Sequence, residues 1–193
     1  PTQLILSGSS STPPSMKIEF KLSTAEDAHI IKNLWPLYQH EVSEFDSCKP
    51  NRHGLFGAND STKTLAEHIE GQEPWWREPE ALFPYLILVD GRPAGFNLVA
   101  ARSRLPEGVD ADFVVHEFFV LHAYRGSGVA EQAARAGFEL HKGQWEIVTY
   151  PSHARALAFW RRVVHAQSRA ALIEQAPNHP WGERVSFRFD NSA

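Results

Sequence analysis

The spacing of apolar positions predicts both strands and helices in the first part of the chain. Residues 16–22, MKIEFKL, alternate apolar and charged side chains, as expected for a strand at a sheet edge. Apolar residues then recur at helical spacing over residues 30–42, and Pro36 is expected to kink or interrupt that helix. A second, short helix is predicted over 61–70.

The middle and end of the chain alternate between the two kinds of element. Two apolar runs flank Gly91-Arg92-Pro93, a pattern typical of a β-hairpin. The predicted elements are, in order, strands at 83–90, 94–102 and 113–121, a helix from 129 to about 142, a strand at 145–150, a helix at 152–165, and strands at 170–174 and 184–189. Without an internal repeat or a linker, this order predicts one α/β domain.

Composition narrows the class of protein. The chain has 193 residues, of which 42% are hydrophobic, enough for one domain with a sizeable core. A net charge of −4 argues against a broad nucleic-acid-binding surface. No apolar run approaches the ~20 residues of a membrane span. The single cysteine, Cys48, cannot form an internal disulfide, so we expect a cytoplasmic protein.

The first fifteen residues differ from the rest in composition. They are rich in Ser, Pro and Gly and lack the basic leader and apolar core of a secretory signal. We expect residues 1–15 to be a flexible N-terminal extension or an expression remnant. Residues 16–193 are expected to form the single folded domain.

A tight glycine-containing turn lies between the strand at 113–121 and the helix that follows it. Its glycines let backbone N–H groups approach an anion, and the helix start supplies unpaired N–H donors and a positive dipole end. The arrangement suits a pyrophosphate, although an ordinary glycine-capped turn would read the same way. The predicted cradle comprises Arg125, Gly126, Ser127, Gly128, Val129 and Ala130.

Two motifs give the chain a resemblance to a known family. Arg125-x-x-Gly128-x-Ala130 matches the Q/R-x-x-G-x-G/A signature of the GNAT superfamily of acyl-CoA-dependent N-acetyltransferases. The preceding HEFFV resembles that family's fourth strand, and His153-x-x-Ala156-x-x-Phe159-Trp160 resembles its N-x-x-A-x-x-F-Y helix. The resemblance implies an acetyltransferase-like domain with a mixed, strongly twisted central sheet. Helices would cover both faces, and the sheet would splay near strands four and five.

The chain departs from the family pattern at two positions. Histidine stands at 153 in place of asparagine, and tryptophan stands at 160 in place of the tyrosine that often protonates the leaving thiolate. An indole N–H does not ionise usefully and cannot take that part. Tyr124 or Tyr150 could replace it, and solvent is a further proton source. The departure also leaves open an alternative function, an acyl-CoA-binding regulatory module with little or no catalysis.

Two adjacent residues of the fourth predicted strand are candidates for proton transfer. Histidine titrates in the right range, and a carboxylate in an apolar strand can have its pKa raised by desolvation. Neighbouring strand residues point to opposite faces, so only one of them can face the acceptor unless a bulge intervenes. We favour Glu117 over His116 as the catalytic residue; the alternative is that both are structural.

Further residues are assigned to the acyl-CoA site through the resemblance. A free backbone N–H at Val120 or Leu121 would hydrogen-bond the thioester oxygen. His153, Phe159 and Trp160 would lie along the pantetheine arm, with core packing as the alternative for Trp160. Acetyl-CoA is the implied co-substrate. The ten histidines show no metal-ligand spacing, so we expect no metal.

The resemblance implies transfer of an acetyl group from acetyl-CoA to a primary amine, directly within a ternary complex. The acceptor would be a small molecule or a peptide, with neither nucleic acid nor membrane as partner, and a homodimer stays open. Residues 25–80 carry more carboxylates than cations, which favours a cationic acceptor, although solvated helix faces fit equally well. Candidate walls of the acceptor cleft, for which core packing or a dimer contact fits equally well, are Trp35, Tyr38, Phe45, Trp75 and Trp76.

Overall fold

The structure is a computed structural model that describes residues 16–57, 63–168 and 170–192. The predicted N-terminal extension therefore lies outside the described residues, as does the start of the helix expected at 61–70. The strands are β1 (Ile18–Leu22), β2 (Leu82–Val89), β3 (Arg92–Ala101), β4 (Phe113–Val120), β5 (Gln144–Thr149), β6 (Leu172–Ala176) and β7 (Arg184–Asp190). The helices are α1 (Ala28–Asp46), α2 (Leu65–Glu70), α3 (Pro74–Arg77), α4 (Val129–Leu140) and α5 (Ala154–Gln167).

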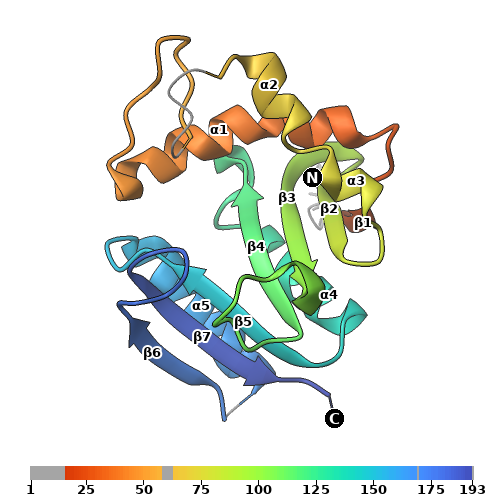
Figure 1. The fold of residues 1–193 in the computed structure, drawn as a ribbon. Helices are drawn as coiled ribbons and strands as arrows, with labels where there is room; N and C mark the ends of the chain where they lie inside the picture. Colours follow the sequence, from red (N-terminus) through yellow and green to blue (C-terminus); the bar gives the residue numbers. More distant parts are fainter. Residues whose placement is uncertain (1–15, 58–62, 169, 193) are drawn as a thin grey trace, which may run out of the picture.

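These strands form one sheet in the order β1-β2-β3-β4-β5-β7-β6. All neighbours are antiparallel except β4 and β5, which are parallel. Figure 1 shows β4 and β5 diverging from the end where they pair. The expected α/β class, the mixed sheet and its splay between the fourth and fifth strands are confirmed.

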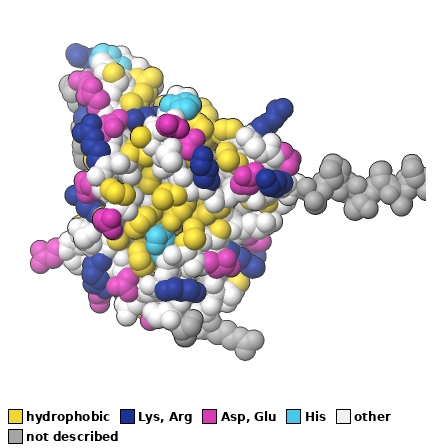
Figure 2. Space-filling model, turned by 90° about the vertical axis from the view of Figure 1, so that its right-hand side faces the viewer, with side chains coloured by type: hydrophobic (Ala, Val, Ile, Leu, Met, Phe, Trp, Pro, Cys, Tyr) yellow, Lys and Arg dark blue, Asp and Glu magenta, His cyan; other side chains and the backbone are white. Residues whose placement is uncertain are grey.

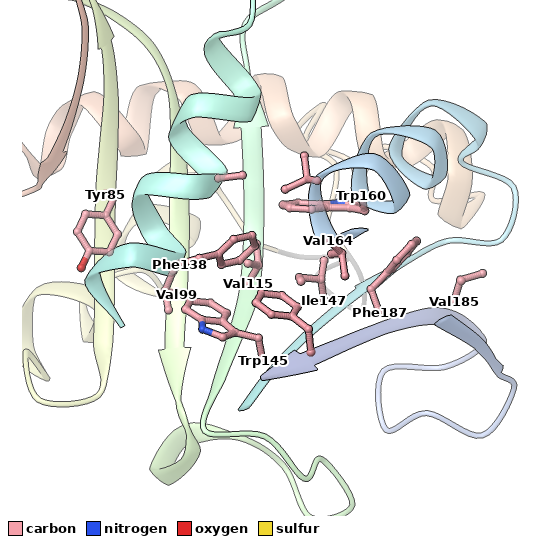
Figure 3. Close-up of a cluster of buried hydrophobic side chains, with 13 residues drawn as sticks. Tyr85, Val99, Val115, Phe138, Trp145, Ile147, Trp160, Val164, Val185 and Phe187 are labelled. Carbon is pink, nitrogen blue, oxygen red and sulfur yellow. The ribbon is translucent and has the colours of Figure 1, made fainter. Parts of the chain in front are cut away.

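Helices cover both faces of the sheet, and α1, α4 and α5 each bury apolar residues against it. Ile31 and Leu34 of α1 pack with Phe96 and Phe119 on one face. On the other face, α4 and α5 contribute Phe138 and other buried residues to the largest core cluster, several of whose members are drawn in Figure 3. Among the described helices, none has the length and apolar character that crossing a membrane requires.

Local details differ from the predicted boundaries. The β2–β3 turn is Asp90-Gly91, where both residues have positive φ, one position earlier than predicted; two such residues suit a tight hairpin. Helix α1 continues through Pro36 instead of breaking there. The sequence pattern does not predict the short helix α3, whose clearest local signal is Pro74 at its start.

Candidate functional site

The splay between β4 and β5 creates the main opening of the sheet. The two strands are in register only from Phe113 to Val115 on β4 and from Trp145 to Ile147 on β5. Beyond that point, side chains of both strands line a cavity of about 720 Å³. We call this the larger cavity; α1 and the segment between β6 and β7 supply other parts of its wall.

A β-bulge brings His116 and Glu117 into the same cavity. Leu98 pairs with Glu117 and Val99 with Val115, so His116 is an extra residue on β4. Both side chains therefore line the larger cavity, with His116 Nδ1 3.6 Å from Glu117 Oε1. The bulge is the exception that the sequence argument allowed for, and it removes the need to choose between the two residues.

Glu117 is held in an environment that suits a base. Burial raises its pKa to about 8, against a smaller opposing effect of the Arg184 charge. The hydroxyl of Tyr38, on α1, donates a hydrogen bond to Glu117 Oε2. A carboxylate with such a pKa can accept a proton near neutral pH and release it again.

His116 stays neutral at physiological pH. Its ring meets Trp75 and Trp181 edge to face, at centroid distances of 5.5 and 5.7 Å. This enclosure lowers its pKa to about 4. The side chain nevertheless keeps 40% exposure. His116 is therefore an uncharged ring with open contact to the cavity.

The turn before α4 presents a row of backbone N–H groups. Gly126 and Gly128 have φ values of 78° and 84°, which favour glycine. No hydrogen bond within the described ranges uses the backbone N–H groups of residues 126–131. Ser127 donates its hydroxyl to the carbonyl of Tyr124, and the Val129 side chain is buried, so both contribute backbone only.

The guanidinium group of Arg125 donates hydrogen bonds to two separate parts of the protein. Its Nε donates to the carbonyl oxygen of Val120 at 2.8 Å, and its Nη2 pairs with Glu41 of α1 at 2.6 Å. Arg125 thus joins α1, the end of β4 and the glycine turn. Its structural part is larger than the sequence indicates.

A second cavity of about 410 Å³ lies beside this turn and adjoins the larger one. We call it the smaller cavity. Phe118, His153 and Trp160 line both cavities. Phe159 lines the smaller cavity and stacks on Phe118, with ring centroids 5.7 Å apart. The cavity thus combines free N–H donors at one end with aromatic walls, which fits a diphosphate joined to a long, thin arm.

The backbone of β4 separates the two candidates for the oxyanion donor. The Leu121 N–H donates to the Ala94 carbonyl at 2.7 Å, so the prediction of a free N–H at Leu121 is wrong. Backbone groups alternate sides along an antiparallel pair, which turns the Val120 N–H away from β3. The Val120 N–H therefore faces the splay, where β5 does not pair with it.

His153 is the N-cap of α5, a position that Ser152 could also have taken from sequence. Its Nδ1 accepts a hydrogen bond from the Ala156 N–H at 3.3 Å. Its ring stacks on Phe45, with centroids 3.8 Å apart. Burial lowers its pKa, so the ring is a neutral wall and cap.

The aromatic residues proposed for the acceptor cleft divide into two groups. Trp35 and Tyr38 line the larger cavity, and Trp75 packs against His116, which also lines it. Phe45 instead supports His153, and Trp76 packs in the core with its indole donating to Ser23. The division depends on what each ring meets in the fold, which spacing along the sequence does not show.

Most carboxylates of residues 25–80 lie outside the cavities. Asp46 lines the larger cavity and Glu41 the smaller one. Others form ion pairs that line neither cavity, such as Glu73 with the largely buried Lys32 and Glu78 with Arg104. Asp60 lies outside the described residues. Charges of both signs are likewise interspersed over the face in Figure 2.

Sequence reasoning missed several cavity residues. Arg184 and Trp181 come from the C-terminal part of the chain and line the larger cavity. Arg155 and Arg162 of α5 line the smaller one. The described residues hold no group of three His, Cys, Asp or Glu side chains suited to a metal ion.

Several solved acetyltransferases have the same fold. The chain matches an acetyltransferase from Thermus thermophilus at 13% identity and TM-score 0.60, covering 90% of this chain and 97% of that one. It matches aminoglycoside acetyltransferase AAC(6')-Ib, in complex with coenzyme A and kanamycin, at 17% identity and TM-score 0.63, covering 90% and 95%. AAC(6')-Iy in complex with a bisubstrate analogue matches at 15% and 0.55, covering 76% and 89%.

Comparison with family models gives the family. Residues 36–165 match the model described as Acetyltransferase (GNAT) family. The chain therefore belongs to the GNAT acetyltransferase family, as the two motifs predict. No match is found among curated protein sequences.

Proposed function

We propose that this protein transfers an acetyl group from acetyl-CoA to a primary amine of a small molecule, by direct transfer in a ternary complex. The observation that carries the proposal is the meeting of two cavities at the splay of β4 and β5. One has a row of free N–H groups, and the other holds a carboxylate with a raised pKa. Each reactant has its own cavity, and their walls meet at Phe118 and Trp160.

The glycine turn binds the diphosphate of the co-substrate in this proposal. The N–H groups of residues 126–130 and the start of α4 supply donors and a positive dipole end. Arg125 positions the turn, and Phe159 and Trp160 flank the pantetheine arm. Acetyl-CoA supplies the thioester, and the chain supplies binding and proton transfer.

Glu117 acts as the general base. It takes a proton from the acceptor ammonium, whose pKa near ~10 otherwise keeps the nitrogen from attacking. The nitrogen then bonds to the carbonyl carbon, the C–S bond breaks, and the second proton of the attacking nitrogen passes to solvent as the amide forms. The N–H of Val120 stabilises the negative charge that develops on the carbonyl oxygen. His116 lies beside this carboxylate as a neutral ring, with Nδ1 3.6 Å from Oε1.

Tyr150 is the better of the two tyrosine candidates for protonating the thiolate. It lines the larger cavity, whereas Tyr124 lines neither described cavity and packs against a core cluster. Burial raises the pKa of Tyr150, which keeps the phenol protonated until a proton is needed. Trp160 then needs no acid role.

The test is a panel of amines assayed for release of free thiol from acetyl-CoA. We expect amine-dependent release with at least one primary amine, and stabilisation against heating by CoA but not by ATP. Stabilisation by CoA without thiol release for any amine would instead support the regulatory module. Stabilisation by ATP alone would contradict both functions.

A further inference from the structure

Arg184 is a cation on the wall of the larger cavity. It is the first residue of β7 and lines the cavity together with Tyr150 and Trp181. Its guanidinium carbon lies 4.0 Å from the centroid of the Tyr150 ring, so the aromatic face holds the side chain in place. The side chain is therefore positioned at the cavity wall.

The hydrogen-bonding capacity of Arg184 is mostly unused. Its Nη1 donates to the neighbouring Glu183 carbonyl at 2.8 Å, and no carboxylate in the described ranges pairs with it. Two other arginines have carboxylate partners. Arg125 pairs with Glu41, and Arg188 pairs with the buried Glu146. Arg184 has several donors left for a partner.

The charge of Arg184 acts across the cavity. Its positive charge lowers the pKa of Glu117, against the larger effect of burial, and it also lowers the pKa of Tyr150. The carboxylates that line the larger cavity are Asp46 and Glu117, while Lys63 and Arg184 are the cations. Because Glu117 has a pKa of about 8, near neutrality this lining is not an acidic one. A polycation finds little complementary charge here.

We propose that the acceptor is an amino acid with an apolar side chain, and that Arg184 binds its carboxylate. The proposal rests on the proposed amine acetylation and names its substrate class. The amine lies toward Glu117, and the carboxylate takes the unused guanidinium donors, a pairing for which arginine is well shaped. The apolar side chain packs against the rings of Trp35 and Trp181.

The test compares L-phenylalanine with 2-phenylethylamine, which lacks only the carboxylate, and with kanamycin. The wild-type protein should have the highest kcat/KM for L-phenylalanine. Arg184→Gln should lower that value by roughly ten- to hundredfold, the size of a lost charge-assisted hydrogen bond, mainly through KM. Because Arg184 also contacts Tyr150 and affects the pKa of Glu117, the informative quantity is the ratio of kcat/KM for L-phenylalanine to kcat/KM for 2-phenylethylamine. Arg184→Gln should lower this ratio by roughly tenfold or more at about pH 9, where Glu117 is ionised.

Arg92→Gln is the matched control, since Arg92 is exposed at the β2–β3 hairpin and lines neither cavity. It should leave all three acceptors unchanged, and stabilisation by CoA should show that both variants are folded. The inference is overturned if the wild-type protein uses 2-phenylethylamine or kanamycin at least as well as L-phenylalanine and Arg184→Gln does not change these preferences. That outcome leaves the acetyltransferase activity itself intact. Absence of acetylation of any amine overturns the proposed function itself.

Discussion

Glu117 combines burial with a hydrogen bond from Tyr38, and the two act in opposite directions on its pKa. Burial disfavours the carboxylate and raises the pKa to about 8. Donation from the Tyr38 hydroxyl favours the charged form. Tyr38 of α1 therefore affects the pKa of Glu117, although α1 is far from β4 in sequence.

Tyr38→Phe removes that donor without removing the ring. We expect the midpoint of the pH–rate profile to move toward alkaline pH by roughly one unit, equivalent to a hydrogen bond to a charged group of about 1.5 kcal/mol. The rate on the alkaline plateau should change little. A profile that stays in place, measured by thiol release across pH, would show that the hydroxyl does not act on Glu117.

The same residue affects stability. The folded pKa of Glu117 is about 8, above its ordinary value of 4.5, so the folded state binds the proton more tightly. Its contribution to stability is complete below about pH 4.5 and is lost as the pH rises toward 8. Glu117→Gln should therefore gain thermal stability relative to wild type over that window.

Thermal unfolding at a series of pH values measures this difference. Glu139→Gln, at an exposed position of α4, is the control and should follow wild type throughout. A constant difference between wild type and Glu117→Gln from pH 5 to 8 would contradict the raised pKa.

Sequence could identify Glu117 and His116 but not their relation. Their types and their strand were readable, whereas sharing one cavity depends on the register shift between Leu98 and Val99. That shift is set by pairing with another strand. Tyr38 lies 79 positions from Glu117, and no local pattern signals such a contact.

At the scale of elements, the glycine turn was predictable because its requirements are local. Positive φ at Gly126 and Gly128 and the start of α4 follow directly from the order strand, turn, helix. The splay of β4 from β5 was expected only through the family resemblance. Its extent follows from the end of register at Val115, which no periodicity shows.

Gly126→Ala and Gly91→Ala form a matched pair. Both glycines have positive φ, 78° and 73°, and an added Cβ would meet no atom within 4 Å at either. Each variant should lose about 1–2 kcal/mol of unfolding free energy through backbone strain. Gly126→Ala alone should also weaken CoA binding, because relaxation of the turn moves the N–H donors.

Denaturant unfolding and calorimetric titration with CoA test this pair. The account predicts equal destabilisation and unequal affinity. Similar CoA affinities for the two variants would place the diphosphate away from the turn.

At the scale of the whole molecule, the helices that carry the two motifs, α4 and α5, both line the smaller cavity. Trp160 is buried, packs edge to face on Phe118, and lines both cavities, so the residue that departs from the family pattern still shapes the site. The C-terminal part of the chain adds Arg184 and Trp181 to the cavity wall, although sequence analysis assigned them no part. They reach the cavity wall because β7 pairs antiparallel with β5.

The pH dependence of amine-dependent thiol release, compared between wild type and Glu117→Gln, tests the central claim most directly. We predict a wild-type kcat/KM that rises through about pH 8 and a variant at least about 100-fold slower that binds CoA equally well. A variant that retained the wild-type rate and pH profile would show that Glu117 is not the base.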